Sequence, residues 1–181
     1  GFQADQPITL ILYHAVLQEV GEADRQMQEI MEAVKECDVQ VLALMPNSDA
    51  GGQAIGQVLQ RYASQQGFRV VTHLERSDFL SWMAAADVMV GNSSSGIIEA
   101  ATLGLRVVNV GDRQRFRERN ENTLDVPPDA GEIAAAIRSS LAAGRSHWHN
   151  VYGDDGAAAR IVDALVTLPI TPELLTKANA Y

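Results

Sequence analysis

The stretch "VGNSSSGIIE", Val90 to Glu99, lies between a strand pattern and a helix pattern. The apolar residues 88–90 come directly before it, and apolar residues then recur at helical spacing through residues 97–101. Glycine and serine, which lie between the two patterns, are typical of tight turns and helix starts. The stretch therefore predicts a buried strand, a turn and a helix, which together form one unit of a parallel α/β sheet.

The same alternation runs through most of the chain. Apolar residues recur at helical spacing over residues 27–34, 55–62, 79–83 and 133–141, and shorter apolar runs lie between these segments. Runs of strand length lie at Ile8–Tyr13, Val39–Leu44, Phe68–Val71, Val88–Val90, Val107–Val110 and, more weakly, Thr123–Val126. A strand followed each time by a helix predicts an α/β fold, a doubly wound parallel sheet of the Rossmann-like type with strand order 3-2-1-4-5-6.

Composition limits the partners. The chain has 181 residues, 46% of them hydrophobic, which is enough for one well-buried core. Its net charge of −9 argues against binding to nucleic acid or to an anionic membrane, because both need a clustered positive field. No segment has the pattern of a signal peptide or a membrane span, so a cytoplasmic location is expected. Small molecules and other proteins remain as partners.

Metal and disulfide chemistry are not expected. The single cysteine, Cys37, cannot form an internal disulfide or a cysteine metal site. His147 and His149 lack acidic neighbours at a spacing that would complete a metal site, and they are assigned to a surface loop. No metal ligands are therefore predicted.

The predicted strand order places a ligand crevice between the first and fourth strands. Open α/β sheets bind ligands at the carboxyl ends of their strands, where the strand order reverses. His14 follows the first strand, and the serine-rich turn follows the fourth. These two segments are therefore expected to meet.

The turn itself has two readings. Ser93, Ser94, Ser95 and Gly96 could cradle a diphosphate, because a helix start offers free backbone N–H groups and the positive end of the helix dipole. Serine also caps helices with no ligand at all. Glu99 lies one turn beyond Ser95 and could accept hydrogen bonds from a sugar diol beyond the phosphates, although it could equally face solvent.

Five segments resemble the hydrolysing UDP-N-acetylglucosamine 2-epimerases, specifically their C-terminal half. They are "LYHAV" at 12–16, "MPNSDAGG" at 45–52, "VGNSSSGIIEA" at 90–100, "VVNVGDRQRFRER" at 107–119 and "VYGDDGAAARI" at 151–161. The resemblance implies one half of a two-domain glycosyltransferase-B arrangement, with residues 1–181 as one UDP-binding domain and a tail at 168–181 that packs on a missing N-terminal domain. It also implies a homo-oligomer when the protein is full length, and no cofactor.

The resemblance assigns roles to individual residues. Ser93 and Ser94, with the turn around them, match the family's diphosphate contacts, and Glu99 matches its contact to the ribose hydroxyls. His14 matches the family's histidine near the departing phosphate oxygen, which makes it the candidate catalytic residue. The family usually has proline after this histidine, whereas Ala15 stands here.

Three further positions match the family by the same comparison. Asn47 matches a polar contact in the loop after the second strand, and Arg113 matches an arginine on the phosphate side. Leu74 falls where the family's backbone meets uracil. The structural alternatives are an ordinary turn residue for Asn47 and an exposed loop arginine for Arg113.

The implied chemistry converts UDP-N-acetylglucosamine into N-acetylmannosamine and UDP, as in sialic-acid-type synthesis. UDP leaves C1 while a base removes the C2 proton, and the resulting glycal is hydrated. Three alternatives stay open: a non-hydrolysing 2-epimerase, a glycosyltransferase of the same architecture, and a module that only binds a UDP-sugar.

Overall fold

Six parallel strands form one sheet in the order β3-β2-β1-β4-β5-β6 in the computed structural model, which describes residues 2–153 and 156–176. The strand order predicted from the sequence is therefore confirmed, as is the α/β class. The strands are β1 (Ile8–Leu12), β2 (Gln40–Leu44), β3 (Phe68–Val71), β4 (Val88–Gly91), β5 (Arg106–Val110) and β6 (Thr123–Val126).

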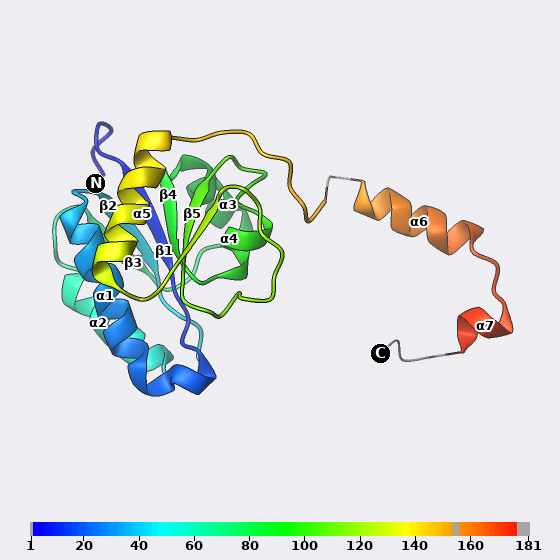
Figure 1. The fold of residues 1–181 in the computed structure, drawn as a ribbon, viewed down its shortest axis with the longest axis horizontal. Helices are drawn as coiled ribbons and strands as arrows, with labels where there is room; N and C mark the ends of the chain where they lie inside the picture. Colours follow the sequence, from blue (N-terminus) through cyan, green and yellow to red (C-terminus); the bar gives the residue numbers. More distant parts are fainter. Residues whose placement is uncertain (1, 154–155, 177–181) are drawn as a thin grey trace. The chain divides into compact units, whose positions relative to one another are not determined.

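Helices cover both faces of this sheet (Figure 1). On one face lie α1 (Ala23–Glu36), α2 (Gly52–Tyr62) and α5 (Ala130–Ala143), and on the other lie α3 (Arg76–Ala85) and α4 (Ser94–Ile98). A 3₁₀ helix, η1 (Leu17–Glu22), leads into α1. Further along the chain are α6 (Ala157–Thr167) and α7 (Pro172–Leu175).

The alternation of side chains along β1 explains the two layers. Ile11 packs into the core on the side of α1, α2 and α5, whereas Leu10 and Leu12 pack with Phe79 and Met83 of α3. Successive side chains of a strand point to opposite faces, so a strand that is buried at each position from Thr9 to Leu12 must be covered on both. β6 is an edge strand with intermediate or exposed residues, which accounts for its weaker apolar pattern.

The helix after β4 is shorter than its sequence pattern indicates. It ends at Ile98, and Glu99 is its C-cap rather than an interior residue. The Ala100 N–H group bonds back to the Ser95 carbonyl, and Gly104 adopts a positive φ of 66° before β5. The expected continuation through Ala101 is therefore wrong, because the chain must turn at once to reach the neighbouring strand.

The chain divides into two compact units, residues 1–151 and 152–181. The first holds the sheet and both cores, and the second holds α6 and α7. The single domain predicted for residues 1–181, and the packing of residues 168–181 on a further domain, stay predictions; residues 177–181 of that tail lie outside the described residues. Across residues 2–153 and 156–176, no helix is long and apolar enough to span a membrane.

Candidate functional site

The carboxyl ends of β1 and β4 come unusually close together. Gly91 pairs with Leu12 and has a φ of 142°, and a Cβ atom built on it would lie 2.1 Å from the Leu12 carbonyl oxygen. Only glycine fits such an approach without displacing the backbone. The glycine therefore lets the segments after the two strands, which begin with Tyr13 and Asn92, lie side by side.

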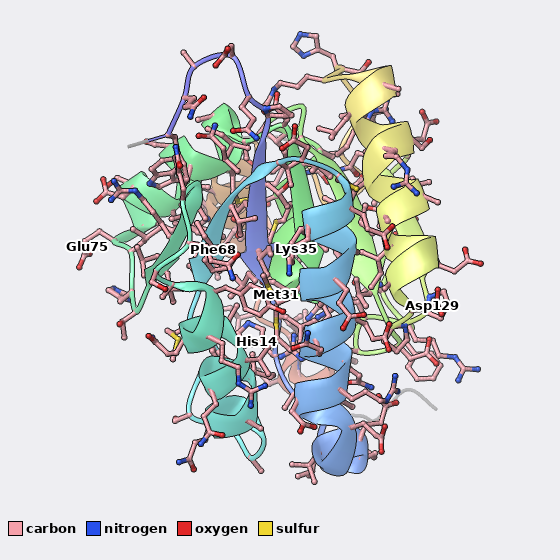
Figure 2. All side chains as sticks on the ribbon, turned by 90° about the vertical axis from the view of Figure 1, so that its left-hand side faces the viewer. His14, Met31, Lys35, Phe68, Glu75 and Asp129 are labelled. Atoms are coloured by element: carbon pink, nitrogen blue, oxygen red, sulfur yellow. The ribbon has the colours of Figure 1, made fainter. Side chains whose placement is uncertain are left out.

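Asn92 joins these two segments through its side-chain amide. Its Oδ1 accepts a hydrogen bond of 2.8 Å from the His14 backbone N–H, and its Nδ2 donates one of 2.8 Å to the His14 carbonyl. Asn92 is 1% exposed, so both hydrogen bonds are sheltered from water. In Figure 2 His14 lies at the end of the sheet from which α1 and α2 start. The expected meeting of the first and fourth strand ends is present.

The imidazole of His14 is held in a partly buried position. Burial lowers its pKa below the ordinary value, and the charge of Arg113 lowers it further, against smaller opposing effects of a hydrogen bond with Asn47 and the charge of Asp49. Its Nδ1 atom is buried and has no hydrogen-bond partner among the described residues. At neutral pH the ring is therefore uncharged, and Nε2 is the nitrogen that can reach a ligand.

The loop after β5 reaches the same place. Arg113 Nη1 donates to the Asn92 carbonyl at 3.0 Å, and the nearly buried Gln114 donates to the same oxygen from Nε2 at 2.9 Å. Arginine has five N–H donors, so this single bond leaves others for an anion. Asn92 therefore forms hydrogen bonds with both His14 and Arg113 and holds the two residues close together.

The serine turn caps its own helix in this ligand-free structure. Ser93 is the N-cap of α4, and its Oγ accepts from the Ser95 N–H at 3.3 Å and lies 2.8 Å from the Ser95 Oγ. The Gly96 N–H bonds to the Ser93 carbonyl at 3.2 Å. Both backbone contacts are long, and an anion at the turn would compete with them. The half-buried Ser94 makes no hydroxyl hydrogen bond within the described residues.

Gly96 has a packing role that the sequence did not indicate. A Cβ atom at this position would lie 3.0 Å from a methyl carbon of Val107 in β5. Glycine therefore lets the short α4 lie directly on the sheet, which fixes the height of the serine turn above the strand ends.

Glu99 does not face solvent alone. Nη1 of Arg76, the first residue of α3, lies 3.1 Å and 3.0 Å from its two carboxylate oxygens. The Glu99 side chain is 27% exposed. The start of α3 and the end of α4 therefore meet at this ion pair.

The two remaining candidates lie on the loops that follow β2 and β3. Asn47 is exposed, and its Nδ2 donates to Asp49 Oδ2 at 2.5 Å. Leu74 is partly buried and packs against the core on the α3 side, so its side chain has a structural role. Its backbone lies just ahead of the helix that carries Arg76.

The arrangement combines donors and a cation with a carboxylate set further along α4. His14, Arg113 and the serine hydroxyls suit an anion with several oxygens, and Glu99 suits hydroxyl donors beyond it. Across residues 2–153 and 156–176, no three His, Cys, Asp or Glu side chains cluster as metal ligands.

Sequence reasoning missed three residues that build this site. Gln114 and Asn92 lie inside quoted motifs, Arg76 lies two residues after Leu74, and Asn92 directly follows the fourth strand. Polar residues at the carboxyl end of a buried strand are themselves a signal for a site in an open α/β sheet.

The sequence of the chain matches known proteins. A family model described as UDP-N-acetylglucosamine 2-epimerase covers residues 2–166. Over all 181 residues the chain is 42% identical to UDP-N,N'-diacetylbacillosamine 2-epimerase (hydrolyzing) of Legionella pneumophila, and it spans 48% of that protein, its C-terminal half. It is 29% identical over 124 residues to GDP/UDP-N,N'-diacetylbacillosamine 2-epimerase (hydrolyzing) of Campylobacter jejuni, covering 67% of this chain and 32% of that one.

The fold matches solved structures of the same kind. UDP-GlcNAc 2-epimerase from Neisseria meningitidis, solved with UDP-GlcNAc bound, gives a TM-score of 0.71 at 17% identity, over 91% of this chain and 46% of that one. These neighbours have the glycosyltransferase-B type of fold, of which this chain represents one half. The chain belongs to the UDP-N-acetylglucosamine 2-epimerase family.

Proposed function

We propose that this chain is the UDP-binding half of a hydrolysing UDP-N-acetylglucosamine 2-epimerase. The observation that carries the proposal is the meeting of His14, Arg113 and the serine turn around Asn92, at the carboxyl ends of β1 and β4. Family membership and the fold support the same reading.

The proposed substrate is a UDP-activated 2-acetamido sugar. UDP-N-acetylglucosamine would give N-acetylmannosamine and UDP, as in sialic-acid-type synthesis. The Legionella relative is named for a diacetamido sugar, so the substituents at C4 and C6 are expected to vary within this class. The hydrolytic outcome, the cytoplasmic location and the homo-oligomeric state stay predictions for the whole enzyme.

In the proposed reaction this chain acts on the leaving group. The C1–O bond breaks, and its electron pair leaves with the β-phosphate of UDP. Arg113 and the serine hydroxyls stabilise the charge that develops on that phosphate, and His14 donates a hydrogen bond from Nε2. The base that takes the C2 proton is expected in the other half of the enzyme.

UDP should bind this chain alone, but weakly, because one side of the cleft is left open to water. We expect a dissociation constant in the millimolar range, about −4 kcal/mol. Titration of the ¹⁵N-labelled chain by NMR should shift the amide signals of the serine turn and of His14. ADP and NAD should cause smaller shifts at the same concentration.

Two arginine variants make this test specific. Arg113→Ala should weaken UDP binding several-fold, because it removes a cation from the phosphate side. Arg138→Ala is the matched control. Arg138 lies on α5 and pairs at 3.9 Å with Glu36, the last residue of α1, away from the carboxyl ends of the strands. Stronger binding of ADP or NAD than of UDP would contradict the proposal, as would equal effects of the two variants.

A further inference from the structure

We propose that Arg76 is a positioning residue that holds the Glu99 carboxylate ready for the ribose hydroxyls of the nucleotide. The inference rests on the proposed function, since it takes the ligand to be UDP and Glu99 to be its ribose contact. It assigns a role to a residue at the start of α3, on a different element from His14, Arg113 and the serine turn.

The contact that carries the inference is specific in its geometry. A single nitrogen, Nη1 of Arg76, is 3.1 Å from one Glu99 oxygen and 3.0 Å from the other. The Glu99 side chain is 27% exposed and that of Arg76 is 65% exposed, so the carboxylate is the more sheltered member of the pair. The Glu99 backbone is fixed separately, because its N–H bonds to the Ser95 carbonyl at 2.9 Å.

This geometry leaves the carboxylate able to bind a diol. An ionised carboxylate has about four acceptor positions on its two oxygens, and an arginine nitrogen placed between them occupies the inner side. The outer positions remain free for two neighbouring hydroxyl groups. Arg76 and a ribose can therefore bind Glu99 at the same time.

Holding the side chain in advance should strengthen binding. Glutamate loses much rotamer freedom when it is immobilised, and a partner that fixes it before the ligand arrives removes that cost from the binding step. The positive charge of Arg76 also offsets the negative charge of Glu99, which would otherwise repel a diphosphate at the serine turn. Both effects predict weaker UDP binding without Arg76.

The test compares UDP with 2′,3′-dideoxy-UDP, which lacks both ribose hydroxyls. Dissociation constants are measured by NMR titration for the wild-type chain, Arg76→Ala, Arg76→Lys and Glu99→Gln, with Arg138→Ala as control. In the wild type UDP should bind roughly tenfold more tightly than the dideoxy compound, which corresponds to about 1.4 kcal/mol. Glu99→Gln should bring this ratio close to one.

Arg76→Ala should lower the ratio by about threefold or more, and Arg76→Lys should restore part of it, since lysine keeps the charge but not the planar donor group. Arg76→Ala should have no further effect on the ratio in the Glu99→Gln background, because the two residues act as one unit. The melting temperature of Arg76→Ala should stay near that of the wild type, as expected for an exposed ion pair.

The outcomes separate the two proposals. If the ratio depends on Glu99 but stays at the wild-type value in Arg76→Ala, the positioning role is overturned and the UDP site stands. Tighter UDP binding in Arg76→Ala would also overturn it, since Arg76 would then be a competitor for Glu99. If UDP does not bind, or if the wild type does not distinguish the two nucleotides, the assignment of Glu99 to ribose fails and the role of Arg76 fails with it.

Discussion

The environment of His14 has a consequence for stability as well as for ligand binding. Its backbone is fixed by Asn92, and its ring is partly buried with Nδ1 unpartnered within the described residues. Burial and the charge of Arg113 lower its pKa from 6.5 in the folded state. The folded protein therefore resists protonation of this ring, whereas the unfolded chain does not.

The sign of the pH dependence follows from that difference. Well above pH 6.5 the ring is neutral in both states and does not affect the free energy of unfolding. As the pH falls below that value, the unfolded state takes up the proton first, so stability decreases until the folded-state pKa is passed. Wild type should therefore lose stability relative to His14→Gln between about pH 7 and pH 5 in urea denaturation.

His73→Gln is the control for this experiment. The His73 side chain is 78% exposed and lies 3.7 Å from Glu75, on the loop before α3. Its variant should follow the wild type across the whole pH range. A stability difference between wild type and His14→Gln that does not change with pH would contradict the buried neutral state of His14.

At the scale of elements, the corner where β4 ends depends on glycine more than on the serines. Gly91 has a φ of 142°, and a Cβ atom added to it would lie 2.1 Å from the Leu12 carbonyl oxygen. Gly111, after β5, has a φ of 76° but open space around it, and Gly21 in η1 has open space and no unusual φ. Alanine at Gly91 would therefore meet both backbone strain and steric overlap, alanine at Gly111 backbone strain alone, and alanine at Gly21 neither.

Alanine at these positions should therefore destabilise the protein in a fixed order. We expect a change within about 0.5 kcal/mol for Gly21→Ala, about 1 kcal/mol for Gly111→Ala, and about 2–4 kcal/mol for Gly91→Ala. At this chain length 1 kcal/mol corresponds to roughly 2–4 °C in melting temperature, so thermal unfolding resolves the series. Equal effects at Gly91 and Gly111 would mean that the strand ends can move apart.

The same corner shows what the sequence could and could not predict. Buried strands leave a strong apolar signal, and the order of such strands with intervening helices is narrowly restricted, so the meeting of the strand ends near His14 was predictable. The partners of Asn92 were not, because they are backbone groups 78 residues away. The length of α4 was predicted wrongly because Ala101 is buried at helical spacing although it lies beyond the helix, and periodicity reports burial rather than hydrogen bonding.

At the scale of the whole molecule, the two units differ in how much they bury. The core residues come from the strands, α1, α2, α3 and α5 and the connections between them, all within residues 1–151. α6 and α7 contain no buried residue. The large apolar side chains of α6, which are Ile161, Val162, Leu165 and Val166, are exposed. Unit 1 therefore has the cores that a domain needs to fold by itself.

Removal of residues 152–181 should leave this unit folded. Because none of the buried core side chains is lost, we expect the free energy of unfolding to change by no more than about 1 kcal/mol. Chemical denaturation followed by circular dichroism measures the change, and the m-value should fall only slightly since little buried surface is removed.

The contrasting truncation ends after Pro128 and also removes α5, whose Ile133, Ala134 and Ile137 are fully buried, and it should abolish cooperative unfolding. If the shorter deletion alone abolished it, the second unit would be part of the folding core, and the sheet with its flanking helices would not be an independent domain.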